Sequence, residues 1–452
     1  MNTIPFVHEG LGNSSYIIDL GNQMAVVVDP DRNVERYFDV LDARKLKLTA
    51  VFETHLHADF VSGAKELAAR TSSPIFLAGD AAAKFPHEAV HGGQTIALEG
   101  CEVAALDSPG HTPEHLSWVF KTASAPPALL SGGSLIVGGA ARTDLISASM
   151  TESLTRAQFR TLHQAFSELP DETLLYPTHG GGSFCSTGAG GERVSTLGQE
   201  RRTNPVLSVE DEGEFARWFP STFPAVPDYF FRLRAVNQKG PALRHDILQP
   251  LPLDPSEFAQ LQSDCVVVDV RSKEAYAEGH IAGSLSNAYR DVFAIWLGWL
   301  VPADARLLFV TDETPVEDIV DESLLVGYER FAGWLKGGVG SWQASGHDLE
   351  RIQLVDAARA RRFLADGAAS LDIREPNEYQ AGHIEAAIHL PLGRLGNNLN
   401  LVPRDRPIVV YCGHGERAST AASLLEAAGF RDLVNLDGGI GSWRDSGFNL
   451  VQ

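Results

Sequence analysis

Short apolar runs alternate with turns and helical stretches along the first half of the chain. Residues 15–19, 25–29 and 48–52 are typical of strands, because β-branched and aromatic residues dominate them. Residues 63–70 have the composition and spacing of a helix. A second set of strand and helix patterns follows over residues 129–176. Strands interleaved with helices predict a layered α/β domain.

The second half of the chain contains one pattern twice. The segments 268–271 (Val-Asp-Val-Arg) and 279–281 (Gly-His-Ile) return as 371–374 (Leu-Asp-Ile-Arg) and 382–384 (Gly-His-Ile). A spacing near one hundred residues indicates a domain-sized duplication rather than a solenoid repeat. Three prolines within residues 250–255 predict a linker between the two halves.

Length, charge and cysteine content narrow the class of protein. A chain of 452 residues is too long for one ordinary core, and we predict domains at 1–245, 256–350 and 353–452. The net charge of −21 disfavours nucleic acid and anionic membranes as partners. Four scattered cysteines and the lack of a secretory signal pattern favour a reducing cytoplasm. We also expect a homo-oligomer.

A cysteine follows a buried type of strand in the second copy of the repeat. Residues 408–412 (Ile-Val-Val-Tyr-Cys) are typical of a parallel strand that ends at Cys412, and 418–428 predict a helix just after it. Loop N–H groups and the helix N-terminus can therefore converge on the sulfur, and Arg417 adds a positive charge. These features favour the thiolate, which is the nucleophilic form of cysteine. The alternative is a buried structural cysteine.

The loop from Cys412 to Arg417 resembles the CxxGxR loop of the rhodanese (sulfurtransferase) family, and the Asp-x-Arg and Gly-His-Ile segments resemble its other markers. The resemblance implies an α/β domain with a parallel sheet, buttressed by Asp372 and Arg374. It also implies that Cys412 takes up sulfane sulfur as a persulfide, with Arg417 holding the charge. The other loop residues implied to bind substrate are Gly413, His414, Gly415 and Glu416.

The first copy of the repeat lacks this loop. Residues 308–312 (Leu-Phe-Val-Thr-Asp) align with 408–412, so that Asp312 is expected where the cysteine stands in the second copy. A carboxylate cannot carry a sulfane sulfur. The copy at 256–350 is therefore predicted to be inactive and to serve in packing or docking.

Histidines occur in three loops that follow strand-like runs in the first half. His55, His57 and Asp59 form an HxHxD motif, while His111 and His179 stand beside glycines further along. Neutral imidazole is a common ligand for metals of intermediate softness. Three such loops predict a metal cluster, whereas a single histidine would more often be structural.

The order of these motifs resembles the metallo-β-lactamase fold, an αββα sandwich. Further details are similar to the persulfide dioxygenases; they lie at residues 10–16, 57–63, 138–144 and 196–201. From about residue 5 onward, the whole chain resembles a persulfide dioxygenase fused to two rhodanese domains. The resemblance implies a mononuclear iron(II) that oxidises a low-molecular-weight thiol persulfide with O₂ to sulfite and thiol.

The ligand set that this family uses is incomplete in the chain. His55 and His111 match its two histidine ligands, but Gly133 stands at the position of its aspartate. Three outcomes are open: iron(II) held by these histidines with His57 or Asp59 as a substitute, zinc held by three histidines including His57, or no metal. We expect that a metal still binds.

Several arginines are candidates for binding an anionic substrate. Arg142 and Asp144 lie in a segment that the family uses around its metal site. Arg193, Arg201 and Arg202 lie within residues 188–204 and either grip the carboxylates of a thiol such as glutathione or form a solvated surface.

Three functions follow from these patterns. The first is a bifunctional enzyme of sulfide and persulfide metabolism, with thiol persulfide, thiosulfate and sulfite as its small molecules. The second is a sulfurtransferase alone, with an N-terminal domain that binds persulfide or a partner. The third is a hydrolase of the glyoxalase type that uses a zinc-bound hydroxide. The family details favour the first, and Gly133 keeps the second open.

Overall fold

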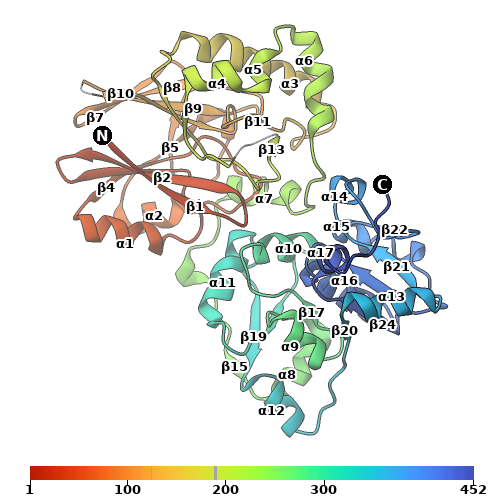
Figure 1. Ribbon diagram of the computed structural model, residues 1–452. Coiled ribbons are helices and arrows are strands. Elements are labelled where there is room, and N and C mark those ends of the chain that lie inside the picture. Colours follow the sequence, from red (N-terminus) through yellow and green to blue (C-terminus); the bar gives the residue numbers. More distant parts are fainter. Residues whose placement is uncertain (124, 188–190) are drawn as a thin grey trace. The chain divides into compact units, whose positions relative to one another are not determined.

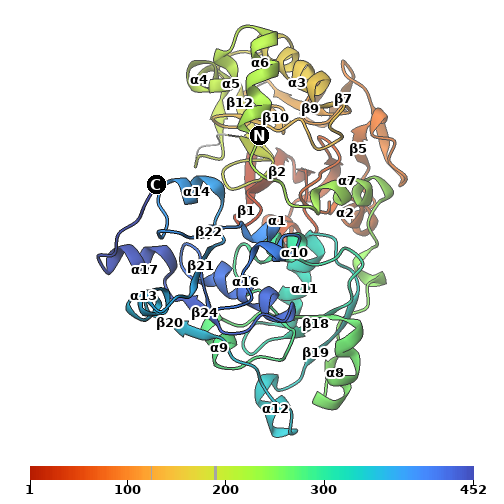
Figure 2. The same cartoon turned by 90° about the vertical axis from the view of Figure 1, so that its right-hand side faces the viewer.

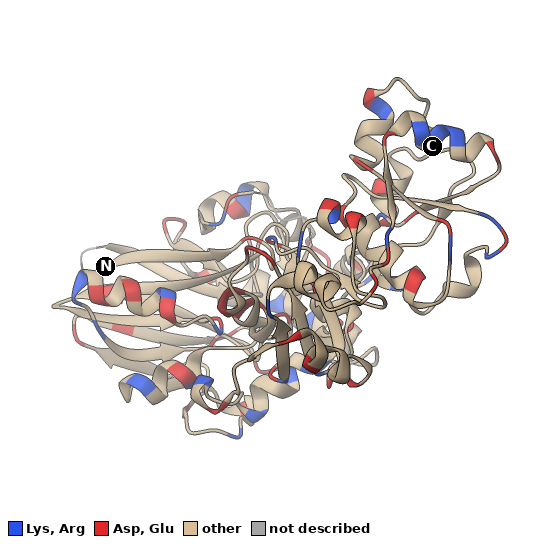
Figure 3. Ribbon diagram, turned by 90° about the horizontal axis from the view of Figure 1, so that it is seen from below, with Lys and Arg blue, Asp and Glu red and all other residues tan. Residues whose placement is uncertain are grey.

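The computed structural model describes residues 1–452 except residues 124 and 188–190. The chain divides into two compact units. The first consists of Met1–Ile247 with Asp321–Gly327, and the second of Leu248–Val320 with Tyr328–Gln452. Figure 3 shows that acidic and basic residues are interleaved along the ribbon of both units.

The first sheet of the first unit has six strands in sequence order. They are β1 (Asn2–His8), β2 (Asn13–Gly21), β3 (Met24–Val28), β4 (Lys47–Phe52), β5 (Ile75–Ala78) and β6 (Glu88–Val90). β1 to β3 pair antiparallel, and β3 to β6 pair parallel. Alternate residues of a strand point to opposite faces. Ile17 and Val27 accordingly pack with Tyr37 of α1 (Glu35–Arg44) and Leu67 of α2 (Ala64–Thr71).

The second sheet has the strand order β14-β12-β10-β9-β8-β7. Its strands are β7 (Thr95–Leu98), β8 (Cys101–Asp107), β9 (Leu116–Thr122), β10 (Ala125–Gly132), β12 (Leu174–Pro177) and β14 (Ser195–Thr196). Tyr16 and Phe52 of the first sheet share one core cluster with Trp118 and Phe120 of the second. The two sheets are therefore stacked face to face.

Helices cover the outer face of the second sheet. They are α3 (Thr151–Arg160), α4 (Leu197–Thr203), α5 (Pro205–Ser208) and α6 (Glu212–Trp218). Phe159 and Phe215 of these helices pack against Val119 and Leu129. The unit also contains β11 (Ala140–Ala141), β13 (Ser186–Thr187) and α7 (Phe230–Lys239). Figures 1 and 2 show the order helix, sheet, sheet, helix, which confirms the predicted αββα sandwich.

The second unit contains two five-stranded sheets whose strands all pair parallel. The first, in the order β15-β19-β18-β16-β17, consists of β15 (Pro252–Leu253), β16 (Val266–Asp269), β17 (Leu285–Ser286), β18 (Leu307–Val310) and β19 (Phe331–Leu335). The second, in the order β20-β24-β23-β21-β22, consists of β20 (Gln353–Val355), β21 (Ala369–Asp372), β22 (Ile388–His389), β23 (Ile408–Tyr411) and β24 (Leu433–Leu436). The equal strand order confirms the duplication.

Helices alternate with the strands in both repeats. The first repeat contains α8 (Pro255–Leu261), α9 (Lys273–Glu278), α10 (Phe293–Leu300), α11 (Val316–Leu325) and α12 (Gly338–Ala344). The second contains α13 (Ala357–Ala365), α14 (Pro376–Gln380), α15 (Leu392–Leu395), α16 (Glu416–Ala427) and α17 (Gly439–Asp445). Among the described residues, we find no helix with both the length and the apolarity that a bilayer span requires.

Two details differ from the prediction. The proline-rich segment 250–255 is not a free linker throughout, because Pro252 and Leu253 form an edge strand paired with β19. An edge strand tolerates proline, since one side of its backbone needs no ladder donor.

The strand register also corrects the alignment of the two copies. Asp269 pairs with Val310 and Asp372 pairs with Tyr411. The residue that follows Val310 is Thr311, so Thr311 and not Asp312 occupies the place of Cys412. The expectation for Asp312 was wrong by one residue, although a threonine is equally unable to carry a sulfane sulfur.

Candidate active sites

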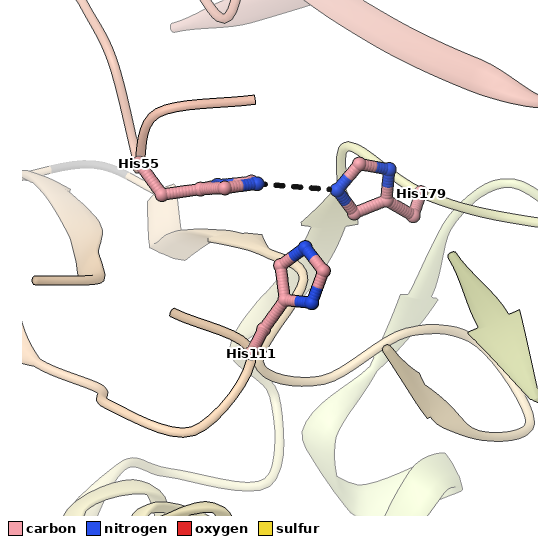
Figure 4. Close-up of side chains that lie close together, drawn as sticks. All are labelled: His55, His111 and His179. Atoms are coloured by element: carbon pink, nitrogen blue, oxygen red, sulfur yellow. Dashed lines mark hydrogen bonds between the residues drawn. The ribbon is translucent and has the colours of Figure 1, made fainter. Parts of the chain in front are cut away.

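Three histidines from separate loops of the first unit point toward one another. His55 follows β4, His111 follows β8 and His179 follows β12. All three are buried, Nε2 of His55 lies 3.3 Å from Nε2 of His179, and one ligand atom from each falls within 4.8 Å of the others. Figure 4 shows the three rings facing a common point. The loops singled out from the sequence are therefore brought together, with His179 as the third imidazole.

The second ring nitrogen of each histidine is held by a neighbour. Nδ1 of His55 lies 2.9 Å from Oγ1 of Thr54, and Nδ1 of His111 donates to the carbonyl of Arg142 at 2.6 Å. Nδ1 of His179 lies 3.2 Å from Oδ1 of Asn13 and 3.1 Å from Asp59. Such partners fix the orientation of a metal-ligating imidazole.

The electrostatics of the site keep the imidazoles in the form that binds metals. Burial, followed by neighbouring imidazoles, lowers the pKa of His55 well below its ordinary value. Burial and His179 lower the pKa of His111 to about 3. Both rings are therefore neutral at physiological pH, with a lone pair to donate. Burial would raise the pKa of Asp59, but His179 and other nearby histidines outweigh it and lower it to about 2.

This donor set fits a metal ion. Nε2 of His111 is buried and has no hydrogen-bond partner among the residues that the structure describes. An unsatisfied buried nitrogen costs about 1–3 kcal/mol, and a metal ligand bond would remove that cost. Three imidazoles with a fourth open position are a known donor set for zinc.

His57 is engaged differently from the other histidines of the cluster. Its Nε2 lies 3.0 Å from Glu53 and 3.3 Å from Asp29, and all three residues are buried. Burial would lower the pKa of His57, but Asp29 and Glu53 raise it to about 10. His57 is therefore a cation at neutral pH, and only its Nδ1 is without a hydrogen-bond partner among the described residues. Its assignment as a ligand stays a prediction.

Gly133 is the position at which the family resemblance implies a carboxylate ligand. A Cβ atom there would lie 2.5 Å from Cδ2 of His111 and 3.0 Å from the Cβ of Ala141. The Gly133 N–H also donates to Nε2 of His115 at 3.1 Å. An aspartate at this position would displace the His111 ring. The set of two histidines with one carboxylate from position 133 therefore does not fit, whereas three histidines do.

The guanidinium of Arg142 forms its hydrogen bonds with other groups of the protein. It donates to Asp144 at 2.6 and 2.8 Å and to the carbonyls of Phe184 and Pro224. Asp144 thus holds Arg142, whose own carbonyl orients His111. The contact to the site runs through the backbone, and a role for Arg142 in binding substrate stays a prediction.

The arginines of segment 188–204 are also paired. Arg201 donates to Asp171 and to three backbone carbonyls within residues 166–169. Arg193 donates to the carbonyl of Gly12 at 2.8 Å. Arg202 donates to Gln199. The structure does not bring Arg201 to the histidine cluster. Residues 188–190 of the predicted anion grip lie outside the described residues.

Sequence reasoning missed several residues that shape this cluster. Asn13, Asp29, Glu53 and His115 all contact a cluster histidine or Gly133. Asn13 lies inside the marked segment 10–16, and His115 follows His111 by four residues, so both stand close to positions that the sequence singles out. Asp29 directly follows β3, a strand that has no metal-site pattern of its own.

In the second unit, Cys412 directly follows β23 and precedes α16. Its side chain is 1% exposed, and its Sγ accepts a hydrogen bond from the Gly415 N–H at 3.0 Å. Gly415 has a φ of 109°, which turns this N–H back toward the sulfur. The predicted convergence of loop N–H groups on the sulfur is therefore present for Gly415.

Arg417 lies in the first turn of α16 and forms a bidentate pair with Glu378, at 2.7 Å for both bonds. Burial would lower the pKa of Arg417, but Glu378 and Cys412 raise it above its ordinary value. Arg417 is therefore always charged, although much of its charge is balanced by Glu378. Beside it, Glu416 and the His414 carbonyl contact Lys273.

The Asp-x-Arg segments have the same geometry in both repeats. Arg374 donates to Asp372 at 2.6 Å and to the carbonyl of Gly382 at 2.8 Å. Arg271 donates to Asp269 and to Gly279 at the same two distances. Both pairs are buried, as expected for a buttress.

The comparisons with known proteins agree with this geometry. The family model of the rhodanese-like domain matches residues 254–345 and 356–446. The thiosulfate sulfurtransferase GlpE of Pseudomonas entomophila is 33% identical over 98 residues, which cover 90% of that relative and 22% of this chain. The chain belongs to the rhodanese family. We call the match at 254–345 the first rhodanese domain and that at 356–446 the second rhodanese domain.

The rhodanese domains follow an N-terminal domain of the metallo-β-lactamase superfamily, whose model matches residues 8–148. The hydroxyacylglutathione hydrolase of Haemophilus ducreyi is 28% identical over 217 residues, covering 43% of this chain and 87% of that relative. A metallo-β-lactamase structure from Staphylococcus aureus subsp. aureus COL superposes with a TM-score of 0.66 at 28% identity, covering 74% of this chain and 98% of that one. The chain thus combines a metallo-β-lactamase domain with two rhodanese domains.

Proposed function

We propose that Cys412 transfers sulfane sulfur between small sulfur anions such as thiosulfate and sulfite. The observation that carries this proposal is the position of Cys412 at the end of a parallel strand, with its sulfur facing the Gly415 N–H. The similarity to thiosulfate sulfurtransferases supports the choice of substrate.

The step is a displacement at sulfur. The Cys412 thiolate attacks the outer sulfur of thiosulfate, a bond forms between the two sulfurs, and the S–S bond of thiosulfate breaks. The electron pair of that bond leaves with sulfite, and Cys412 is left as a persulfide. The Gly415 N–H and the N-terminus of α16 stabilise negative charge on the terminal sulfur. Arg417, held by Glu378, lies beside this charge.

For the N-terminal domain, we propose a metal-dependent reaction of a low-molecular-weight thiol persulfide. His55, His111 and His179 would hold the metal. Iron there would supply the O₂ chemistry that converts a persulfide, O₂ and water into thiol, sulfite and two protons. Thr54, Asn13 and the Arg142 carbonyl hold the ring nitrogens so that the Nε2 lone pairs stay available.

The two proposed reactions fit each other chemically. Sulfite released by persulfide oxidation is an acceptor for the sulfane sulfur on Cys412, and their combination gives thiosulfate. The chain would then act on thiol persulfide, sulfite and thiosulfate within one route of sulfide metabolism.

Hydrolysis by zinc is the second candidate for the N-terminal domain. Three neutral histidines with no carboxylate at Gly133 suit zinc better than the iron set of the dioxygenases. The similarity to a hydroxyacylglutathione hydrolase supports this alternative.

We further propose that the chain divides at 1–245, 256–350 and 353–452 and works in a reducing cytoplasm as a homo-oligomer. Four free cysteines support the reducing compartment. Limited proteolysis followed by mass spectrometry would test the boundaries, and sedimentation would test the oligomer.

Metal content per chain, measured by elemental analysis after anaerobic purification without chelator, tests the N-terminal proposal. Iron together with persulfide-dependent O₂ uptake would support the oxidation. Zinc together with thioester hydrolysis would support the hydrolase, and a protein without metal would overturn both. His111→Ala should lose the metal, whereas the exposed His91→Ala should keep it.

A further inference from the structure

The first rhodanese domain reaches into the Cys412 loop through one lysine. Lys273, the first residue of α9, is 9% exposed. Its Nζ donates to the His414 carbonyl at 2.9 Å and lies 2.9 Å from Asp437 and 3.3 Å from Glu416. His414 and Glu416 belong to the loop that contains Cys412. A single ammonium group therefore joins three points around the catalytic loop.

Lys273 is not part of the pattern that the two repeats share. Arg271 and Arg374 are equivalent, so the position two residues later is Lys273 in the first copy and Pro376 in the second. Both residues begin a short helix, α9 or α14. The rhodanese fold therefore does not require a lysine at this position. The contact with the Cys412 loop explains why a lysine is present.

The charges around Lys273 favour a fixed loop. Burial would lower the pKa of Lys273, but Asp437 and Glu416 raise it above its ordinary value. Backbone donors and Lys273 likewise lower the pKa of Glu416 despite its partial burial. Hydrogen bonds with an ionised partner are about twice as strong as neutral ones.

Helix α16, which begins at the loop, is also held by the first rhodanese domain. Nε2 of His280 lies 2.7 Å from Glu426, and the hydroxyls of Ser286 and Ser419 are 2.9 Å apart. The Ser286 N–H donates to Ser423 at 3.0 Å. Loop and helix are therefore both anchored on the domain that has Thr311 in place of the reactive cysteine.

We propose that the first rhodanese domain completes the sulfur-transfer site through Lys273, a positioning residue that fixes the Cys412 loop. This inference rests on the proposed transfer at Cys412. The domain predicted to be inactive is then a working part of the active site.

Lys273→Met tests the positioning role. The kcat for transfer from thiosulfate to cyanide should fall about tenfold with a smaller change in KM, because the loop loses its fixed geometry. Lys273→Arg should recover part of the loss. The matched control is Lys336→Met, because the Lys336 side chain is 65% exposed and its ammonium lies 3.8 Å from Asp254. Equal kcat values for Lys273→Met and Lys336→Met would overturn the positioning role.

A second measurement does not depend on sulfur transfer. Cys412 is alkylated with neutral iodoacetamide, and the rate at Cys412 is read by peptide mass spectrometry. The rate should rise several-fold in Lys273→Met, because a loop without its anchor exposes the buried sulfur more often, and it should stay constant in Lys336→Met. If wild-type protein transfers no sulfur but the rate rises, the proposed function fails and the positioning role stands. If the rate does not rise, the positioning role is wrong.

Discussion

The two rhodanese domains have the same sheet order and the same buried Asp–Arg pair, yet they end one strand differently. After β23 comes Cys412, in a loop whose Gly415 N–H turns back to the sulfur. After β18 comes Thr311, whose hydroxyl donates to the Thr314 carbonyl at 2.8 Å. The comparison teaches that the residues that build this fold and those that perform its chemistry are separate sets.

The largest expected effect comes from substituting the residues that follow β23 and β18. Cys412→Ser should reduce sulfur transfer to the background rate, because a hydroxyl cannot form a persulfide. Thr311→Cys is the counterpart in the first rhodanese domain. It should add a thiol without adding sulfur transfer, since the loop after β18 does not turn an N–H toward the sulfur of a cysteine at position 311. A thiosulfate-to-cyanide assay of both variants checks this. Transfer by the double variant Cys412→Ser/Thr311→Cys would break the comparison.

The Asp–Arg pairs should behave alike in both domains. Arg374→Met and Arg271→Met each leave an aspartate buried without its partner, which costs about 3–5 kcal/mol of unfolding free energy. Urea unfolding followed by circular dichroism measures the loss. Methionine keeps the apolar part of the side chain. If only Arg374→Met were destabilising, the buttress would belong to the active site and not to the fold.

The first residues of α12 and α17 are glycines, and substituting them sharpens the contrast between the two rhodanese domains. Gly338 and Gly439 have φ values of 59° and 56°, so alanine is strained at both, by about 1–2 kcal/mol. A Cβ at Gly439 would also lie 2.4 Å from the Cys412 carbonyl oxygen, whereas one at Gly338 meets the movable Asp312 carboxylate at 2.6 Å. Gly439→Ala should therefore cost about 3 kcal/mol and impair transfer. Gly338→Ala should lower only the unfolding midpoint, and equal losses of activity would contradict this.

The smallest effect concerns pH. Burial would raise the pKa of Glu378, but Arg417 outweighs it and lowers the pKa below 4.5, the ordinary value. The pair therefore contributes stability that is complete above pH 4.5 and is lost as the pH falls through the lowered pKa. The difference in unfolding free energy between wild type and Glu378→Gln should shrink toward zero in acid. A difference that grew in acid would have the wrong sign.

The sequence alone predicts the helices and strands that depend on a local pattern of residues. The helix expected at 418–428 is α16 (Glu416–Ala427), and the strand expected to end at Cys412 is β23 (Ile408–Tyr411). The alignment of Asp312 with the cysteine was wrong by one residue, because only strand pairing fixes the register between copies. Pro252 was assigned to a linker for the same reason, since its pairing partner lies far along the chain.

The candidate sites were predictable where a motif carries them and not where distant contacts decide. The loops of His55, His111 and His179 were recognised from their neighbours in sequence, and the structure joins them. The charge on His57 depends on Asp29, which no local pattern connects to it. Lys273 contacts a carbonyl 141 residues away, a distance at which a single sequence gives no signal.

The burial of Cys412 limits the size of molecule that can react there. With 1% of the residue exposed, its sulfur is within reach of a reagent of a few atoms but not of a cysteine on the surface of another folded protein. If Cys412 stores a sulfur atom as proposed, that atom would also be shielded from bulky reductants in the surrounding solution. Burial of the proposed nucleophile would therefore select by size, admitting small inorganic anions and excluding protein thiols.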